Sequence, residues 1–127
     1  MSYRVLVVDD SKLARMVMTS ALRRIRPDWE AVEATRADEA LAVVAKENVH
    51  IALVDFNMPE MDGLQLVERM RKSNPDIPIA IVSANLQDEI ISRARELNAA
   101  FVPKPLTDEA IGAFLSGAML RLKKAGK

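Results

Sequence analysis

The chain has 127 residues, in which 18 Lys and Arg side chains balance 18 Asp and Glu side chains, and it contains no cysteine. This length suits one domain with a real core, and the zero net charge argues against an overall basic surface for nucleic acid. The absence of cysteine excludes disulfides, thiolate chemistry and Cys-type zinc sites, and the single histidine, His50, excludes a metal site built from several histidines.

The N-terminal segment does not resemble a signal peptide, because the apolar run at residues 5–8 stops at Asp9 and Asp10. No apolar stretch approaches the roughly 18 residues that suggest a membrane span. We therefore expect a soluble, cytoplasmic protein without membrane insertion. We also expect residues 1–127 to form one domain, with no output domain.

The first apolar run, residues 5–8, is rich in β-branched residues and predicts a parallel strand covered on both faces. From Ser11 the apolar residues recur at helical spacing, which predicts a helix that Pro27 ends. The predicted apolar face of this helix comprises Leu13, Ala14, Val17, Met18, Ala21, Leu22 and Ile25. Residues 30–34 are a weak strand candidate, and Thr35 is expected to cap a second helix that runs to about Asn48.

The third apolar run, residues 51–55, predicts a buried strand that delivers Asp55 to its C-terminal edge and then breaks into a loop. Asp62 and Gly63 open the third helix, which closes at residues 73–75. The sequence therefore predicts that a single carboxylate stands between a buried strand and a loop.

Two further strand–helix pairs complete the chain. Residues 77–82 predict the fourth strand, and the helix after it is expected to carry Leu86, Ile90, Ala94 and Leu97 on one face. Asn98 should adopt the left-handed conformation common at helix ends. Residues 99–102 predict a short fifth strand, and Thr107 should cap the last helix. The basic tail, residues 121–127, suits a helix C-terminus, or alternatively a phosphate or partner contact.

The alternation of strands and helices predicts an α/β fold, a single doubly wound (βα)5 domain with helices on both faces of a five-stranded parallel sheet. The strand order 2-1-3-4-5 is borrowed from known doubly wound folds, because alternation alone does not fix which strands are neighbours. In that order the ligand crevice lies where the first and third strands meet.

Polar side chains follow four of the predicted strands, whose ends share one edge of a parallel sheet. They are Asp9, Asp10, Asp55, Ser83 and Lys104. At about 4 Å and an effective dielectric near 20, each pair of carboxylates repels by roughly 4 kcal/mol. A cation is needed, and an oxygen-only ligand set with room for water and phosphate suits Mg²⁺.

Asp55 is the predicted phosphoryl acceptor, because a carboxylate is already ionised at neutral pH and needs no base to activate it. Lys104 would supply a charge for the phosphoryl oxygens and Ser83 a hydroxyl donor. Each residue also has a structural interpretation: Asp9 and Asp10 as caps of the first helix, Ser83 as a cap of the fourth, and Lys104 as an exposed loop lysine.

The strand-end residues, taken in their order along the chain, resemble those of the receiver domain of two-component response regulators, of the CheY-like type. The resemblance extends over the full length of the chain. The matching segments are Asp9-Asp10-Ser11, the loop from Asp55 to Gly63, Ser83-Ala84, and Lys104-Pro105, which is similar to a lysine before a cis proline. The resemblance implies that Asp10, Asp55 and the backbone carbonyl of Asn57 hold Mg²⁺ directly and that Asp9 acts through water. It also implies that Phe101 is an aromatic switch residue, although Phe101 is also compatible with a core position.

The resemblance further implies a histidine kinase or phosphotransfer domain as donor, and an output protein that binds the surface of the fourth helix, fifth strand and fifth helix. The protein would be a switch, as in chemotaxis or phosphorelays, and an enzyme only toward its own phosphorylation and dephosphorylation. It would be a monomer or a phosphorylation-dependent dimer. The alternatives are an Mg²⁺-dependent phosphohydrolase, which would lack its usual Asp-x-Asp pair because residue 57 is Asn, and an unphosphorylated interaction module.

Overall fold

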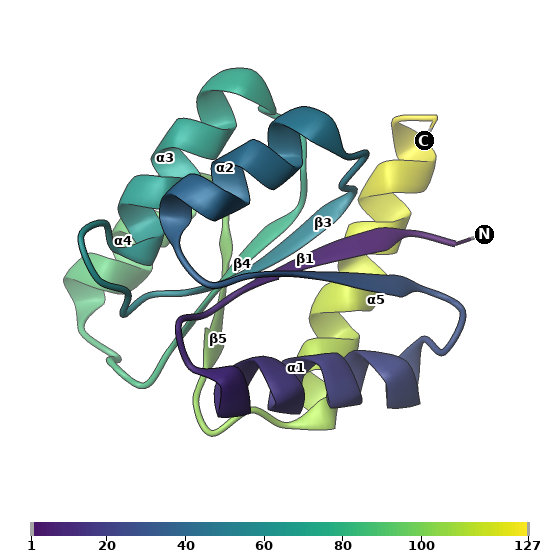
Figure 1. The fold of residues 1–127 in the computed structure, drawn as a ribbon, viewed down its shortest axis with the longest axis horizontal. Helices are drawn as coiled ribbons and strands as arrows, with labels where there is room; N and C mark the ends of the chain where they lie inside the picture. The colour runs from purple at the N-terminus through teal and green to yellow at the C-terminus, as the bar shows by residue number, and fades with distance from the viewer. Residues whose placement is uncertain (1, 127) are drawn as a thin grey trace.

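The strands form one parallel sheet in the order β2-β1-β3-β4-β5 in the computed structural model, which describes residues 2–126 (Figure 1). The strands are β1 (Arg4–Val8), β2 (Glu30–Ala34), β3 (Ile51–Asp55), β4 (Ile79–Ser83) and β5 (Ala100–Pro103). The helices are α1 (Lys12–Ile25), α2 (Ala37–Lys46), α3 (Gly63–Ser73), α4 (Asp88–Glu96) and α5 (Asp108–Lys124). The predicted (βα)5 fold and the 2-1-3-4-5 order are confirmed.

Helices cover both faces of the sheet, with α1 and α5 on one side and α2, α3 and α4 on the other (Figure 1). Side chains alternate along each strand, so Val5 and Val7 pack toward the first pair while Leu6 and Val8 pack toward the other three helices. Burial on both faces explains why β1, β3 and β4 are apolar runs without polar alternation.

The apolar face of α1 is narrower than the sequence predicts. Met18, Ala21 and Leu22 are buried, but Leu13 is 72% exposed and Val17 is 47% exposed. A helix turns by about 100° per residue, so a four-residue repeat drifts by about 40° per step and by about 120° over three steps. A strict repeat of four from Leu13 therefore cannot stay on one buried face.

Three predicted helix boundaries agree with the structure. Asp62 caps α3 through a reciprocal pair of bonds with Gln65, and Thr107 caps α5 by accepting a hydrogen bond from the Ala110 N–H at 3.1 Å. Asn98 follows α4 with a φ of 56°, the left-handed conformation predicted for it.

Two other predicted boundaries are wrong. Arg36, not Thr35, occupies the cap position of α2, and it makes no side-chain capping bond. The Thr35 N–H and hydroxyl both donate to the Glu39 carboxylate instead. Leu86 does not belong to the buried face of α4, because it precedes the helix and is exposed. In the part of the chain that the structure describes, no helix is long and apolar enough to cross a membrane.

Candidate phosphoacceptor site

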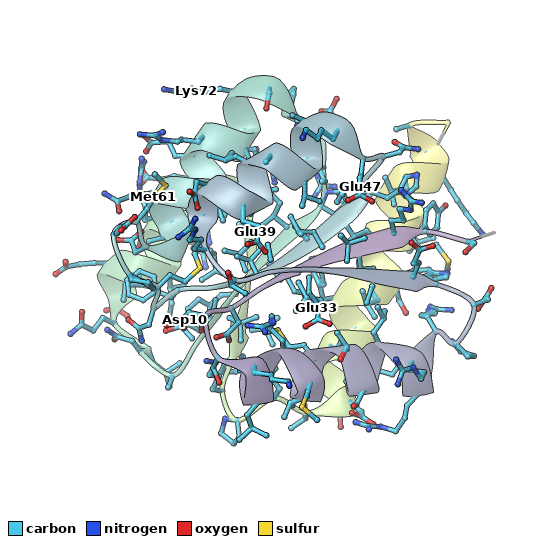
Figure 2. All side chains as sticks on the ribbon, in the orientation of Figure 1. Asp10, Glu33, Glu39, Glu47, Met61 and Lys72 are labelled. Carbon is cyan, nitrogen blue, oxygen red and sulfur yellow. The ribbon has the colours of Figure 1, made fainter. Side chains whose placement is uncertain are left out.

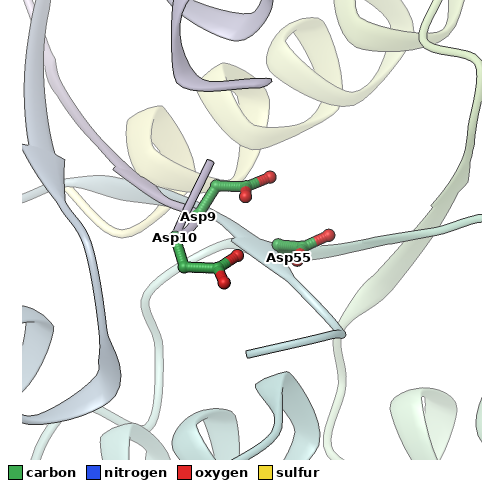
Figure 3. A group of neighbouring side chains, drawn as sticks. All are labelled: Asp9, Asp10 and Asp55. Atoms are coloured by element: carbon green, nitrogen blue, oxygen red, sulfur yellow. The ribbon is translucent and has the colours of Figure 1, made fainter. Parts of the chain in front are cut away.

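Three carboxylates meet at the carboxyl edge of the sheet, because β1 and β3 are neighbours there. Asp9 and Asp10 follow β1 and Asp55 ends β3, and each offers an oxygen within 4.8 Å of the other two (Figure 3). Asp9 and Asp55 are buried, at 1% and 3% exposure, whereas Asp10 is exposed. The structure thus brings together the acidic residues that the strand ends predicted.

Lys104 reaches this cluster from the end of β5. Its Nζ donates a hydrogen bond to Asp55 Oδ1 at 2.8 Å and lies 3.8 Å from Asp9 Oδ2. The Lys104 N–H donates to the Ser83 carbonyl at 3.0 Å, and the Lys104–Pro105 peptide is cis, as the resemblance implies. Lys104 is therefore not a free loop lysine.

Burial and charge act in opposite directions on these groups. Burial raises the pKa of Asp55, and the hydrogen bond from Lys104 opposes that increase. Burial also raises the pKa of Asp9, against the lowering effect of the Ser11 N–H. Burial lowers the pKa of Lys104, but the hydrogen bond to Asp55 and the nearby carboxylates together raise it by more, so its pKa lies above the ordinary value. The lysine is therefore a stable cation beside two carboxylates that burial disfavours as anions.

The donor set fits a small divalent cation. Asp9 Oδ2 is buried and has no hydrogen-bond partner among residues 2–126. A buried carboxylate oxygen without a hydrogen-bond partner is costly, and a bound cation, or a water molecule that the cation holds, would compensate for it. Three carboxylates and no nitrogen or sulfur ligand suit Mg²⁺ chemically. Asn57, the other predicted ligand, lies in the exposed loop just after Asp55.

Ser83 ends β4, the strand next to β3, and its side chain is buried at the same edge. Its hydroxyl oxygen accepts a hydrogen bond from the Asn85 N–H at 2.9 Å. Ser83 does not cap α4, whose cap position is Gln87, and Asp9 and Asp10 do not cap α1, whose cap is Ser11.

Phe101 lies on β5 and is half-buried against the cluster beneath α2, α3 and α4. It is thus a packing residue in this structure, and its strand, β5, is the direct neighbour of the strand that carries Ser83.

Gly63 is a site residue that the sequence identified only as a helix opener. A Cβ at this position would lie 2.4 Å from the Asp55 carbonyl oxygen and 2.9 Å from Phe56 Cα. The Gly63 N–H also donates to the Phe56 carbonyl at 2.8 Å. The loop after Asp55 therefore returns onto the end of β3, and only glycine permits that approach.

The model of the response regulator receiver domain family matches residues 5–116. The chain belongs to this family. The match covers all but the first residue of the five strands and includes the three carboxylates, so the same segment that forms the sheet carries the acidic site. A receiver domain is generally a signalling module, and an acidic pocket of this kind binds Mg²⁺ in the family.

Similar sequences occur both in much longer proteins and in proteins of about the length of this chain. The receiver domain is 36% identical to a protein-glutamate methylesterase/protein-glutamine glutaminase of Methylobacillus flagellatus, over 88% of this chain but 32% of that protein. It is 34% identical to a chemotaxis protein CheY homolog of Campylobacter jejuni, over 85% of both chains. The chain thus spans about a third of the first relative and most of the second.

Solved structures share the fold. Chemotaxis protein CheY4 of Vibrio cholerae superimposes with a TM-score of 0.84 and 26% identity, over 93% of this chain and 99% of that one. A CheY-like receiver domain protein of Methanospirillum hungatei gives a TM-score of 0.88 over 98% and 99% of the two chains, and at 24% identity it supports the fold alone.

Proposed function

We propose that this receiver domain is a phosphorylation switch in which Asp55 accepts a phosphoryl group from a phosphohistidine. The observation that carries the proposal is the environment of the Asp55 carboxylate. It is buried, shares the sheet edge with Asp9 and Asp10, and pairs with Lys104 Nζ at 2.8 Å. The donor would be a histidine kinase or a histidine phosphotransfer protein.

In the proposed transfer, a carboxylate oxygen of Asp55 forms a bond to phosphorus while the bond from phosphorus to the imidazole nitrogen breaks. The electron pair of that bond stays on the imidazole, which leaves as the neutral donor side chain once protonated. Lys104 holds the Asp55 carboxylate before the reaction. We infer that its ammonium then donates to the phosphoryl oxygens, where negative charge gathers.

Asp9, Asp10, Asp55 and the Asn57 carbonyl are the proposed Mg²⁺ ligands, with Asp9 acting through water. When bound, the ion would neutralise the carboxylates together with Lys104 and would share the charge of the phosphoryl oxygens. The carboxylates of this chain supply the oxygen ligands, and their closeness explains why a cation is needed before a phosphoryl group can enter.

We infer that the Ser83 hydroxyl turns from the Asn85 N–H toward the phosphoryl group, and that Phe101 then moves inward. Such an exchange of contacts biases a two-state equilibrium. The surface formed by α4, β5 and α5 would change with it and bind an output protein. The proposal needs no direct contact with nucleic acid.

The proposal is tested by incubating the chain with acetyl phosphate, with and without Mg²⁺, and measuring its intact mass. We expect one Mg²⁺-dependent phosphoryl adduct, which Asp55→Asn abolishes because the amide is not a nucleophile. Asp28→Asn removes an exposed carboxylate elsewhere on the chain and should leave the adduct unchanged. Absence of an adduct on the unaltered chain would instead favour an interaction module, and continuous phosphate release from many esters would favour a phosphohydrolase.

A further inference from the structure

Three polar groups of Asp9, namely its N–H, its backbone carbonyl and its Oδ1, make hydrogen bonds. Its N–H donates to the Ala34 carbonyl of β2 at 3.2 Å, and its Oδ1 accepts from the Ser11 N–H at 2.9 Å. Its backbone carbonyl accepts a hydrogen bond from Arg15 Nη1, also at 2.9 Å. Only Oδ2, the buried oxygen at the cation site, lacks a hydrogen-bond partner in the described chain.

Arg15 connects the carbonyl of Asp9 to two other elements. It projects from the first turn of α1, and its side chain is only 13% exposed. Its Nε donates to Glu33 Oε1 at 2.9 Å. Glu33 lies on β2, directly before the residue that accepts the Asp9 N–H, and Figure 2 labels it between the sheet and α1. One guanidinium thus joins α1, β2 and the end of β1.

We propose that Arg15 is a positioning residue for the cation site, which it sets by fixing the peptide between Asp9 and Asp10. That peptide is planar, so a bond to the Asp9 carbonyl also fixes the direction in which the chain leaves toward Asp10. The two carboxylates then keep the spacing they have around Asp55. This inference rests on the proposed function, since it concerns the same Mg²⁺ ligands.

The effect of Arg15 is geometric. Arg15 contacts the backbone carbonyl of Asp9 and not its carboxylate, which lies beside Lys104, Asp10 and Asp55. The guanidinium offers two donors at a fixed angle, one for the carbonyl and one for Glu33, whereas a lysine ammonium is a single mobile point charge. Arg15→Lys therefore keeps the charge and loses the bridge.

Residues that orient metal ligands without touching the metal usually change metal affinity by tenfold or more when they are replaced. Arg15 acts through a backbone carbonyl rather than on a carboxylate, so we expect the lower end, about a tenfold weaker Mg²⁺ affinity for Arg15→Met. Arg15→Lys should also weaken binding. Glu33→Ala removes only the second anchor of the guanidinium and should weaken binding less than Arg15→Met.

The test is calorimetric titration of Mg²⁺ into the unphosphorylated chain, which does not depend on phosphorylation. Arg23→Met is the matched control, because it removes an exposed cation from the same helix, and its Mg²⁺ affinity should equal that of the wild type. Folding of each variant is checked by urea denaturation without Mg²⁺. If Arg15→Met does not fold, the comparison of Arg15→Lys with wild type decides the question.

A folded Arg15→Met variant, or in its place Arg15→Lys, that binds Mg²⁺ as tightly as the wild type would overturn the inference and leave the proposed function intact. A larger loss in Glu33→Ala than in Arg15→Met would also overturn it, because the anchor would then matter more than the bond to Asp9. A wild-type chain that fails to bind Mg²⁺ would overturn both the inference and the proposed function.

Discussion

The ionisation of Asp55 is opposed by burial and by the nearby Asp9 and Asp10, and it is favoured by Lys104. Burial raises its pKa, and the hydrogen bond from Lys104 lowers it. Because an anionic carboxylate is the nucleophile, Lys104 favours the reactive form of Asp55 before any phosphoryl group arrives. The same contact stabilises the lysine as a cation, since the hydrogen bond to Asp55 raises its pKa. Each member of the pair thus stabilises the charged form of the other at the site where the phosphoryl group is proposed to bind.

Gly63→Ala should damage the site through the backbone. The added Cβ would meet the Asp55 carbonyl oxygen at 2.4 Å and the Asp55 carbonyl carbon at 3.0 Å, and backbone atoms cannot move aside as a flexible side chain can. We expect a loss of about 1–3 kcal/mol in the free energy of unfolding and slower adduct formation with acetyl phosphate. Urea denaturation and intact mass measure the two effects.

Gly117→Ala is the matched control, since Gly117 lies within α5 and a Cβ there would meet nothing within 4 Å. Alanine favours the helix more than glycine, so this variant should gain up to about 1 kcal/mol of stability and phosphorylate normally. Equal stability of the two variants would contradict the steric role assigned to Gly63.

Sequence reasoning reached the residues of the site that stand at strand ends, namely Asp9, Asp10, Asp55, Ser83 and Lys104. Their common edge follows from parallel strands alone, once the strand order is given. Arg15 and Gly63 could not be predicted in the same way, because their roles depend on contacts with the carbonyls of Asp9 and Asp55. Carbonyl contacts leave no pattern in side-chain chemistry, and the only local signal was a glycine directly after Asp62.

At the scale of the elements, the sequence predicts which segments are helices better than which faces are buried. The apolar stripe on α1 begins at Leu13, yet that side chain is 72% exposed because the four-residue repeat drifts around the helix. The strands were easier, since β3 and β4 are buried on both faces and no choice of face is needed. Helix boundaries depend on capping hydrogen bonds. Thr107 makes such a bond at the start of its helix, and Thr35 does not.

Thr107→Ala should cost about 1 kcal/mol of stability, because it removes the hydroxyl that caps the first turn of α5. Thr35→Ala is the control at a threonine that occupies no cap position. Its hydroxyl only donates to the exposed Glu39 carboxylate at 3.3 Å, so the loss should be below about 0.5 kcal/mol. Urea denaturation compares the two, and a larger loss at Thr35 would contradict the assignment of the caps.

For the whole molecule, the sheet order matters most, because it makes β1 and β3 neighbours although an entire strand and two helices separate them in sequence. Local patterns predict the ten elements but not this adjacency, so the order had to be borrowed from known folds. The adjacency places negative charge from two segments at one edge. The fold therefore carries an electrostatic cost that a cation can remove.

This cost should be visible in the stability of the protein. The pKa of Asp9 is raised above its ordinary value of 3.8 in the folded state, mainly by burial. A raised folded-state pKa means that the protonated form is favoured by folding, so the contribution of Asp9 to stability is greatest below pH 3.8 and is lost as the pH rises through the folded-state pKa. At neutral pH without Mg²⁺, the ionised Asp9 carboxylate opposes folding.

Asp9→Asn should therefore raise the free energy of unfolding at neutral pH in EDTA, and this gain should shrink as the pH falls toward 3.8, where the wild-type carboxyl becomes protonated. Added Mg²⁺ should also reduce the difference in the free energy of unfolding between Asp9→Asn and the wild type, because it stabilises the wild type more. At ten times its Kd it stabilises the wild type by about 1.4 kcal/mol, and it should stabilise Asp9→Asn less because one ligand has lost its charge. Urea denaturation at the two pH values, with EDTA or with Mg²⁺, measures all four combinations. An Asp9→Asn variant that is less stable than the wild type at neutral pH in EDTA would contradict the electrostatic cost assigned to this sheet edge.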